Sequence, residues 1–105
     1  MNSTRGLVDW MQEPVEWLVR TAAHNGLSPR ITSTFRSFAA QKRLHEAYLR
    51  GQSEFPAAPP GRSYHQYGRA VDIVLNQDWG YAELGRLWKQ MGGRWWPSDR
   101  IHFEA

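Results

Sequence analysis

The sequence contains no cysteine among its 105 residues. This absence excludes disulfide bonds, thiolate zinc sites and iron–sulfur clusters. Any metal bound by the chain must therefore be held by nitrogen and oxygen ligands. A chain of this length has room for one domain, and so small a domain buries too little surface to have a wide stability margin. We accordingly expect residues 1–105 to form a single domain.

Long apolar runs are also missing. No stretch approaches the roughly 20 apolar residues of a membrane span, and the N-terminal residues lack the continuous apolar core of a signal peptide. We therefore expect synthesis in the cytoplasm without membrane insertion, and action elsewhere would need another component for release. Ten Asp and Glu stand against thirteen Lys and Arg, a formal charge of +3. This balance favours a polyanionic partner, whether nucleic acid, anionic membrane or cell-wall polymer.

The spacing of apolar residues and chain breakers predicts alternating helices and strands. Pro14 predicts a break or a new helix start near Glu13. Ser37 is a suitable cap for the second helix, and Gly51 is a suitable stop. The predicted helices cover 5–25, 38–50 and 78–91, the predicted strands cover 31–35, 69–75 and 101–104, and residues 52–64 form an irregular loop. This order predicts an α+β fold, with helices packed on a small mixed or antiparallel sheet.

Aromatic residues are plentiful, with six tryptophans in this short chain. Trp10, Trp17 and Trp88 lie in the predicted helices, and we expect them in the core because an indole ring buries a large apolar area. Tyr64 and Tyr67 flank a histidine in a predicted loop, where they either contact a ligand or hold the loop in place.

The segment from residue 63 to residue 72, SYHQYGRAVD, contains the first candidate site residues. In the predicted strand, Val71 and Ile73 point to the core and Asp72 points to the opposite face. A carboxylate among small and apolar neighbours is costly to bury unless it is paired or binds a metal. His65 precedes it across Gly68, which permits a sharp turn that returns the imidazole to the carboxylate.

The last predicted strand supplies a second histidine. Ile101 and Phe103 face the core, so His102 and Glu104 face the other way. If this strand pairs with residues 69–75, His102 joins the first histidine and the aspartate on one face. Two imidazoles and one carboxylate leave a fourth position open, which is typical of catalytic zinc sites. Asp99 lies just before this strand.

Three motifs in order make the chain resemble a known family over residues 30–104. SYHQYGRAVD matches the pattern Ser-x-His-x-x-Gly-x-Ala-x-Asp of the zinc D-Ala-D-Ala carboxypeptidases and L-alanyl-D-glutamate endopeptidases, a family that includes phage endolysins. The segment STFRS followed by Gln41, and GGRW followed by Asp99-x-x-His102-Phe103, resemble its other two conserved segments. The resemblance implies the α+β fold that this family shares with the hedgehog signalling domain.

The resemblance also implies roles for individual residues. His65, Asp72 and His102 would bind one zinc ion, which activates a water molecule for amide hydrolysis. Asp99 would take the proton of that water and pass it to the leaving amine. Arg36 would stabilise the oxyanion or grip the substrate, and Ser63 would hydrogen-bond the substrate.

Each of these roles has a plainer structural alternative. Arg36 also suits a structural ion pair, Asp99 a turn before the strand, and Ser63 a cap of the loop. Asp99 stands where many carboxypeptidases of the family have glutamate, and the residue pair before His102 lacks a proline found in endolysin-like members. These departures leave the cleaved bond undetermined, although aspartate at this position favours the endolysin-like endopeptidases.

The resemblance implies a peptidase that acts on peptidoglycan stem peptides as a monomer, with no nucleic-acid partner and no separate cell-wall-binding domain. Without a signal peptide, we expect release through a phage holin, or action as a cytoplasmic D,D-dipeptidase. A catalytically degenerate metal or cell-wall binding module is the main alternative, but the presence of Asp99 and Arg36 argues against it. A basic nucleic-acid binder is a weaker alternative, because the chain has no known motif of that class.

Overall fold

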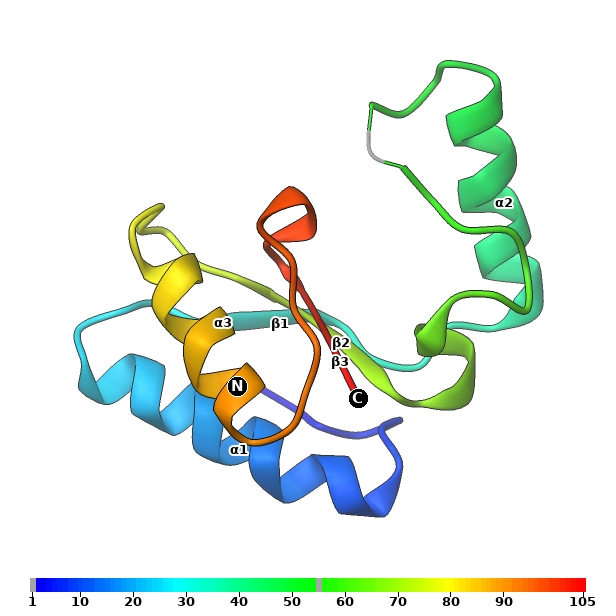
Figure 1. Cartoon of the computed structure of the whole chain (residues 1–105). Helices are drawn as coiled ribbons and strands as arrows, with labels where there is room; N and C mark the ends of the chain where they lie inside the picture. The colour runs from blue at the N-terminus through cyan, green and yellow to red at the C-terminus, as the bar shows by residue number, and fades with distance from the viewer. Residues whose placement is uncertain (1, 55) are drawn as a thin grey trace.

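Three antiparallel strands form the sheet of the computed structural model, which describes residues 2–54 and 56–105. The strands lie in the order β1–β2–β3, so β2 is central. Figure 1 shows α1 and α3 side by side, with α2 and the chain that follows it extending away from them. The elements along the chain are α1 (Asp9–His24), β1 (Arg30–Ser33), α2 (Phe38–Leu49), the 3-10 turn η1 (Tyr64–Tyr67), β2 (Ala70–Val74), α3 (Gly80–Gln90), the 3-10 turn η2 (Pro97–Asp99) and β3 (His102–Glu104).

The strand register places Asp72 at the centre of the sheet. Asp72 lies opposite His102 on β3 and opposite Ser33 on β1, and β1 contains a bulge between Ile31 and Ser33. Val71 lies opposite Phe103 on the other face. The predicted α+β fold and the predicted strand pairing are therefore confirmed, and the sheet is antiparallel rather than mixed.

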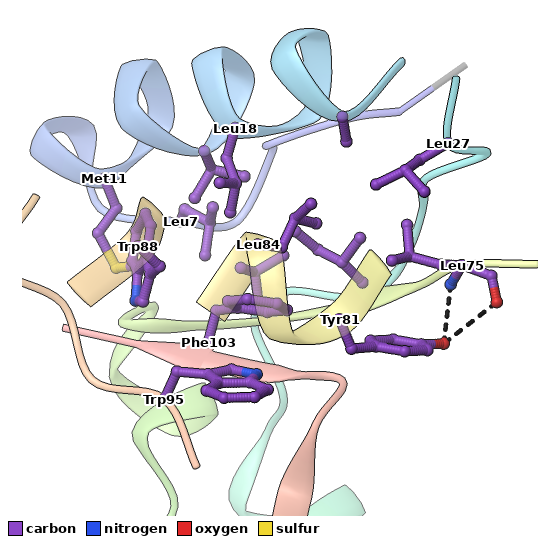
Figure 2. Packing of buried hydrophobic residues seen from close by; sticks show 14 residues of the cluster. Leu7, Met11, Leu18, Leu27, Leu75, Tyr81, Leu84, Trp88, Trp95 and Phe103 are labelled. Atoms are coloured by element: carbon purple, nitrogen blue, oxygen red, sulfur yellow. Dashed lines mark hydrogen bonds between the residues drawn. The ribbon is translucent and has the colours of Figure 1, made fainter. Parts of the chain in front are cut away.

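The hydrophobic core fills the space between the sheet and the layer formed by α1 and α3 (Figure 2). Phe103 is fully buried, with its ring stacked on Trp95 and edge-on to Trp88. Gly85 of α3 faces Trp95, and a side chain at this position would overlap the indole ring. The close approach of α3 to this tryptophan therefore depends on glycine.

Helix α1 corrects two predictions. Pro14 lies inside a continuous helix and does not break it near Glu13, because the buried face formed by Met11, Val15, Leu18 and Ala22 packs on the core along its whole length. Trp10 and Trp17 are 57% and 40% exposed, so their predicted place in the core is wrong. Trp88 is buried as predicted.

Helix α2 holds the irregular segment that follows it. Ser37 caps the helix by accepting a hydrogen bond from the amide of Ala40, as its position in the sequence predicts. The side chain of Gln41 donates to the carbonyl of Ala58 at 2.8 Å, and Nδ1 of His45 donates to the carbonyl of residue 57 at 2.7 Å. These two contacts fix the segment alongside α2. Among the described residues, no helix is long and apolar enough to cross a membrane.

Candidate metal centre and active site

Three side chains from η1, β2 and β3 converge on one point. Nε2 of His65 lies 3.1 Å from Oδ1 of Asp72, and Nδ1 of His102 lies 3.4 Å from the same oxygen. One ligand atom from each residue falls within 4.8 Å of the others. The His65 side chain is only 2% exposed and the other two are 14% exposed, so the group faces limited solvent.

The local sequence explains this convergence. Because side chains alternate along a strand, the pairing of β2 with β3 puts Asp72 beside His102 on the face away from the core. Gly68 ends η1 with a φ of +67°, and its carbonyl accepts a hydrogen bond from the amide of Val8. A Cβ at Gly68 would lie 2.9 Å from a backbone oxygen of residue 6. Glycine therefore permits the turn that brings His65 back to the sheet.

Each imidazole is oriented by a partner on its other nitrogen. Nδ1 of His65 lies 2.7 Å from the carbonyl oxygen of Thr34, which can only accept, so this nitrogen donates and Nε2 faces Oδ1 of Asp72. Nε2 of His102 lies 2.8 Å from Oε1 of Glu104, which leaves Nδ1 facing Asp72. Two imidazole nitrogens and one carboxylate oxygen are a donor set that suits zinc, and such second partners are common around metal-bound histidines.

Electrostatics at this point favour a bound cation. Burial alone would raise the pKa of the Asp72 carboxyl, but hydrogen bonds from His102 and His65 hold that pKa well below its usual range. Burial lowers the pKa of His102, while its hydrogen bonds to Asp72 and Glu104 and the charge of Asp99 raise it more. Asp72 is therefore ionised, and the surrounding carboxylates stabilise positive charge between them.

Arg36 contacts Asp72 and is held by hydrogen bonds to two neighbouring side chains. Its guanidinium donates to Gln41 at 2.9 Å and to Ser33 at 3.0 Å, and it lies 3.5 Å from Oδ2 of Asp72. The carboxylate of Asp72 thus has one oxygen toward the histidines and the other toward Arg36. This geometry fits the structural ion pair that the sequence left open, and Arg36 also lines the adjoining cavity.

A cavity of about 810 Å³ adjoins the three converging side chains. Its walls come from α2, the segment after α2, and residues 96–102, and Leu44, Pro56 and Trp96 are among the apolar lining residues. Two further predicted site residues line it, Ser63 and Asp99. A cavity of this size accommodates several residues of an extended peptide beside the three converging side chains.

Ser63 and Asp99 differ in how firmly they are held. Ser63 caps η1, and its Oγ accepts a hydrogen bond from the amide of His65 at 3.3 Å. Asp99 ends η2 with an exposed side chain, and its amide donates to the carbonyl of Trp96. The structure therefore brings all six predicted site residues to one cavity, and Asp99 alone among them is exposed to solvent.

Sequence reasoning missed most of the groups that orient the candidate site residues. Glu104 shares a strand face with His102 two residues earlier, so alternation placed the two side chains together without indicating a contact. The sequence favours Gln41 as a support of the site region rather than a catalytic group but does not indicate its partners, and it is buried between Arg36 and the carbonyl of Ala58. The carbonyl of Thr34 gives no signal in the sequence, because any residue supplies one.

A family model described as D-alanyl-D-alanine carboxypeptidase, VanY, matches residues 5–99 of the chain. The match ends three residues before His102. No match is found among curated protein sequences.

Several solved structures share the fold. A mutant of the vancomycin-resistance D,D-pentapeptidase VanY, from a VanB-type resistance cassette and in complex with Zn(II), has a TM-score of 0.72 and 18% identity over 99% of this chain and 76% of its own. The LD-carboxypeptidase LdcB has a TM-score of 0.75 and 20% identity over 98% of this chain and 66% of its own. The L-Ala D-Glu endopeptidase ChiX of Serratia marcescens has a TM-score of 0.61 and 24% identity over 96% and 81%. At these identities, the likeness establishes the fold.

Proposed function

Because this chain belongs to the D-alanyl-D-alanine carboxypeptidase family described as VanY, we propose that it is a zinc-dependent peptidase that hydrolyses an amide bond of peptidoglycan stem peptides. The observation that carries the proposal is the convergence of His65, Asp72 and His102 within 4.8 Å beside a cavity of about 810 Å³. One structural neighbour is described as an LD-carboxypeptidase that recognises peptidoglycan and another as an L-Ala D-Glu endopeptidase, and both support the same substrate class.

Nε2 of His65, an oxygen of Asp72 and Nδ1 of His102 would hold the zinc ion. When bound, zinc acts as a Lewis acid that lowers the pKa of a coordinated water to about 7 and polarises a carbonyl group. The carbonyl of Thr34 and the carboxylate of Glu104 keep the two imidazoles in the tautomers that ligation requires. Burial of His65 keeps water from competing for its ligating nitrogen.

Asp99 is the general base and later the general acid. Its exposed carboxylate lines the cavity that adjoins the ligand set, and its negative charge helps to raise the pKa of His102, which supports this role. The carboxylate takes a proton from the attacking water and then delivers that proton to the leaving amine nitrogen, so it ends the cycle ionised again. Proton transfer by a positioned side chain of this kind contributes roughly 10²- to 10⁴-fold to a rate.

Arg36 and Ser63 stabilise and position the substrate. Arg36 is always charged, and from the cavity wall its guanidinium stabilises the negative charge that develops on the attacked carbonyl oxygen. The same guanidinium holds Oδ2 of Asp72. Ser63 accepts the amide of His65 through its oxygen, so its own hydroxyl hydrogen remains available for a substrate carbonyl or carboxylate.

Digestion of purified sacculi tests this function and identifies the bond. The zinc-loaded protein should release soluble products, a chelator should stop the release, and added zinc should restore it. Mass spectrometry of the products separates the two specificities, because a carboxypeptidase frees D-alanine and an endolysin-like endopeptidase frees a peptide that begins with D-glutamate. If the folded, zinc-loaded protein binds sacculi but yields no product, the chain is a binding module instead.

A further inference from the structure

Three arginines line the cavity, and two of them already have a carboxylate partner. Arg36 lies 3.5 Å from Asp72, and Arg100 lies 3.0 Å from Asp78. Arg62 is exposed and has no ion-pair partner within residues 2–54 and 56–105. Arg62 is therefore the one uncompensated cation on the described part of the cavity wall.

The backbone beneath Arg62 is fixed while its guanidinium is free. The amide of Arg62 donates to the carbonyl of Pro59 at 3.0 Å. The preceding Gly61, at a φ of +87°, donates its amide to Gln66 at 2.6 Å and accepts from the hydroxyl of Tyr67 at 2.7 Å. Because three hydrogen bonds hold this turn, binding a ligand at Arg62 requires ordering of the side chain alone.

Arg62 lines the same cavity as the proposed reacting groups and is close to two of them in the sequence. It directly precedes Ser63, and it lies three residues before His65 in the same clamped turn. A guanidinium binds a carboxylate through two parallel hydrogen bonds, which gives both affinity and orientation. Arg36 has already committed donors to Gln41 and Ser33, so Arg62 has more free donors than Arg36.

We propose that Arg62 is a specificity-determining residue that binds a free carboxylate of the substrate next to the cleaved bond. The inference deepens the proposed function and rests on it. Among the groups of a stem peptide that have this chemistry, the two nearest the candidate cleaved bonds are the C-terminal carboxylate and the α-carboxylate of a γ-linked D-glutamate. A primary amide in place of either carboxylate keeps the shape but removes the charge, so the subsite discriminates amidated from non-amidated peptides.

The test uses four synthetic stem peptides in two pairs. One pair differs only in a C-terminal carboxylate or amide, and the other only in D-glutamate or D-isoglutamine. Zinc-loaded wild type is compared with Arg62→Gln and Arg62→Lys, and with Arg43→Gln as the matched control. Arg43 is an exposed arginine of α2 that does not line the cavity. The readouts are KM, kcat and the dissociation constant of each peptide by calorimetry.

Arg62→Gln should raise KM and the dissociation constant about tenfold for the peptides that have the recognised carboxylate, with kcat within about twofold of wild type. Arg62→Lys should recover part of the loss, and Arg43→Gln should change nothing. The amide of the recognised pair should bind wild type and Arg62→Gln alike. The pair that shows this pattern identifies which carboxylate Arg62 binds.

Two results separate failure of this inference from failure of the proposed function. Equal KM and binding for wild type and Arg62→Gln on all four peptides would overturn the role of Arg62 while the peptidase activity stood. Absence of turnover in wild type would overturn the proposed function. In that case, calorimetry would still test Arg62, because binding of the carboxylate peptides does not depend on cleavage.

Discussion

Removal of the Glu104 carboxylate should weaken zinc binding without removing a ligand. Oε1 of Glu104 lies 2.8 Å from Nε2 of His102, and Oε2 lies 3.1 Å from Nε of Arg94. Only 12% of this side chain is exposed, so water has little access to replace its hydrogen bond to His102. In Glu104→Ala, the imidazole of His102 loses the group that fixes its tautomer and its rotation.

The size of the effect follows from the role of such partners. Loss of a hydrogen-bond partner to a metal-bound histidine reduces metal affinity by roughly 10- to 100-fold. This range corresponds to about 1.4 to 2.8 kcal/mol of binding free energy. Glu104→Gln keeps an acceptor oxygen for His102 but loses the charge, so its affinity should fall between those of Glu104→Ala and wild type.

Competition with a chromophoric chelator at neutral pH measures the zinc affinity directly. Glu83→Ala is the matched control, because Glu83 pairs with Arg86 on the exposed surface of α3 and contacts no histidine. Circular dichroism of the metal-free variants checks that each is folded. If folded Glu104→Ala binds zinc as tightly as wild type does, Glu104 does not orient His102 for ligation and the argument from second partners is refuted.

Three further predictions concern pH, the cavity wall and the core. In the metal-free protein, the lowered pKa of Asp72 contributes folding stability that is lost as pH falls below about 4. The raised pKa of His102 contributes folding stability that is lost as pH rises above about 6.5. The melting temperature of the metal-free protein should therefore peak between these values, and a peak above pH 8 would contradict the assignment. Gln41→Ala removes two buried hydrogen bonds, one of them to a charged group, so the free energy of unfolding in urea should fall by about 2 to 4 kcal/mol. Limited proteolysis should also cut residues 52–60 faster, and an unchanged rate of proteolysis would contradict the role of Gln41 in holding this segment. Gly85→Ala forces a methyl group into the ring of Trp95 and should cost about 1 to 3 kcal/mol, whereas a neutral effect would show that α3 packs less closely.

The parts of the fold that local chemistry determines could be predicted. The hydroxyl of Ser37 has few roles before a helical sequence other than to cap it, and it does so. Strict alternation in two short strands put Asp72 and His102 on one face, and antiparallel pairing made them neighbours. The site geometry was predictable to this extent because it depends on strand register rather than on loop conformation.

Other parts depend on packing that the sequence does not show. Pro14 carried a strong local signal for a break, but burial of one helix face outweighed it. Trp10 and Trp17 each precede a buried residue and so lie about 100° around the helix from the core face. The wall made by Gln41 and the segment near Ala58 joins two stretches that have no shared periodicity, so no pattern predicted it.

The central claim is that Asp99 moves a proton for hydrolysis at a zinc site held by His65, Asp72 and His102. The most direct test is the turnover number of Asp99→Asn at full zinc occupancy on the stem peptide that wild type cleaves. Asparagine keeps the size of the side chain but accepts no proton at neutral pH. We predict one bound zinc ion per chain and a kcat lowered by about 10²- to 10⁴-fold. A kcat near that of wild type would contradict this role of Asp99.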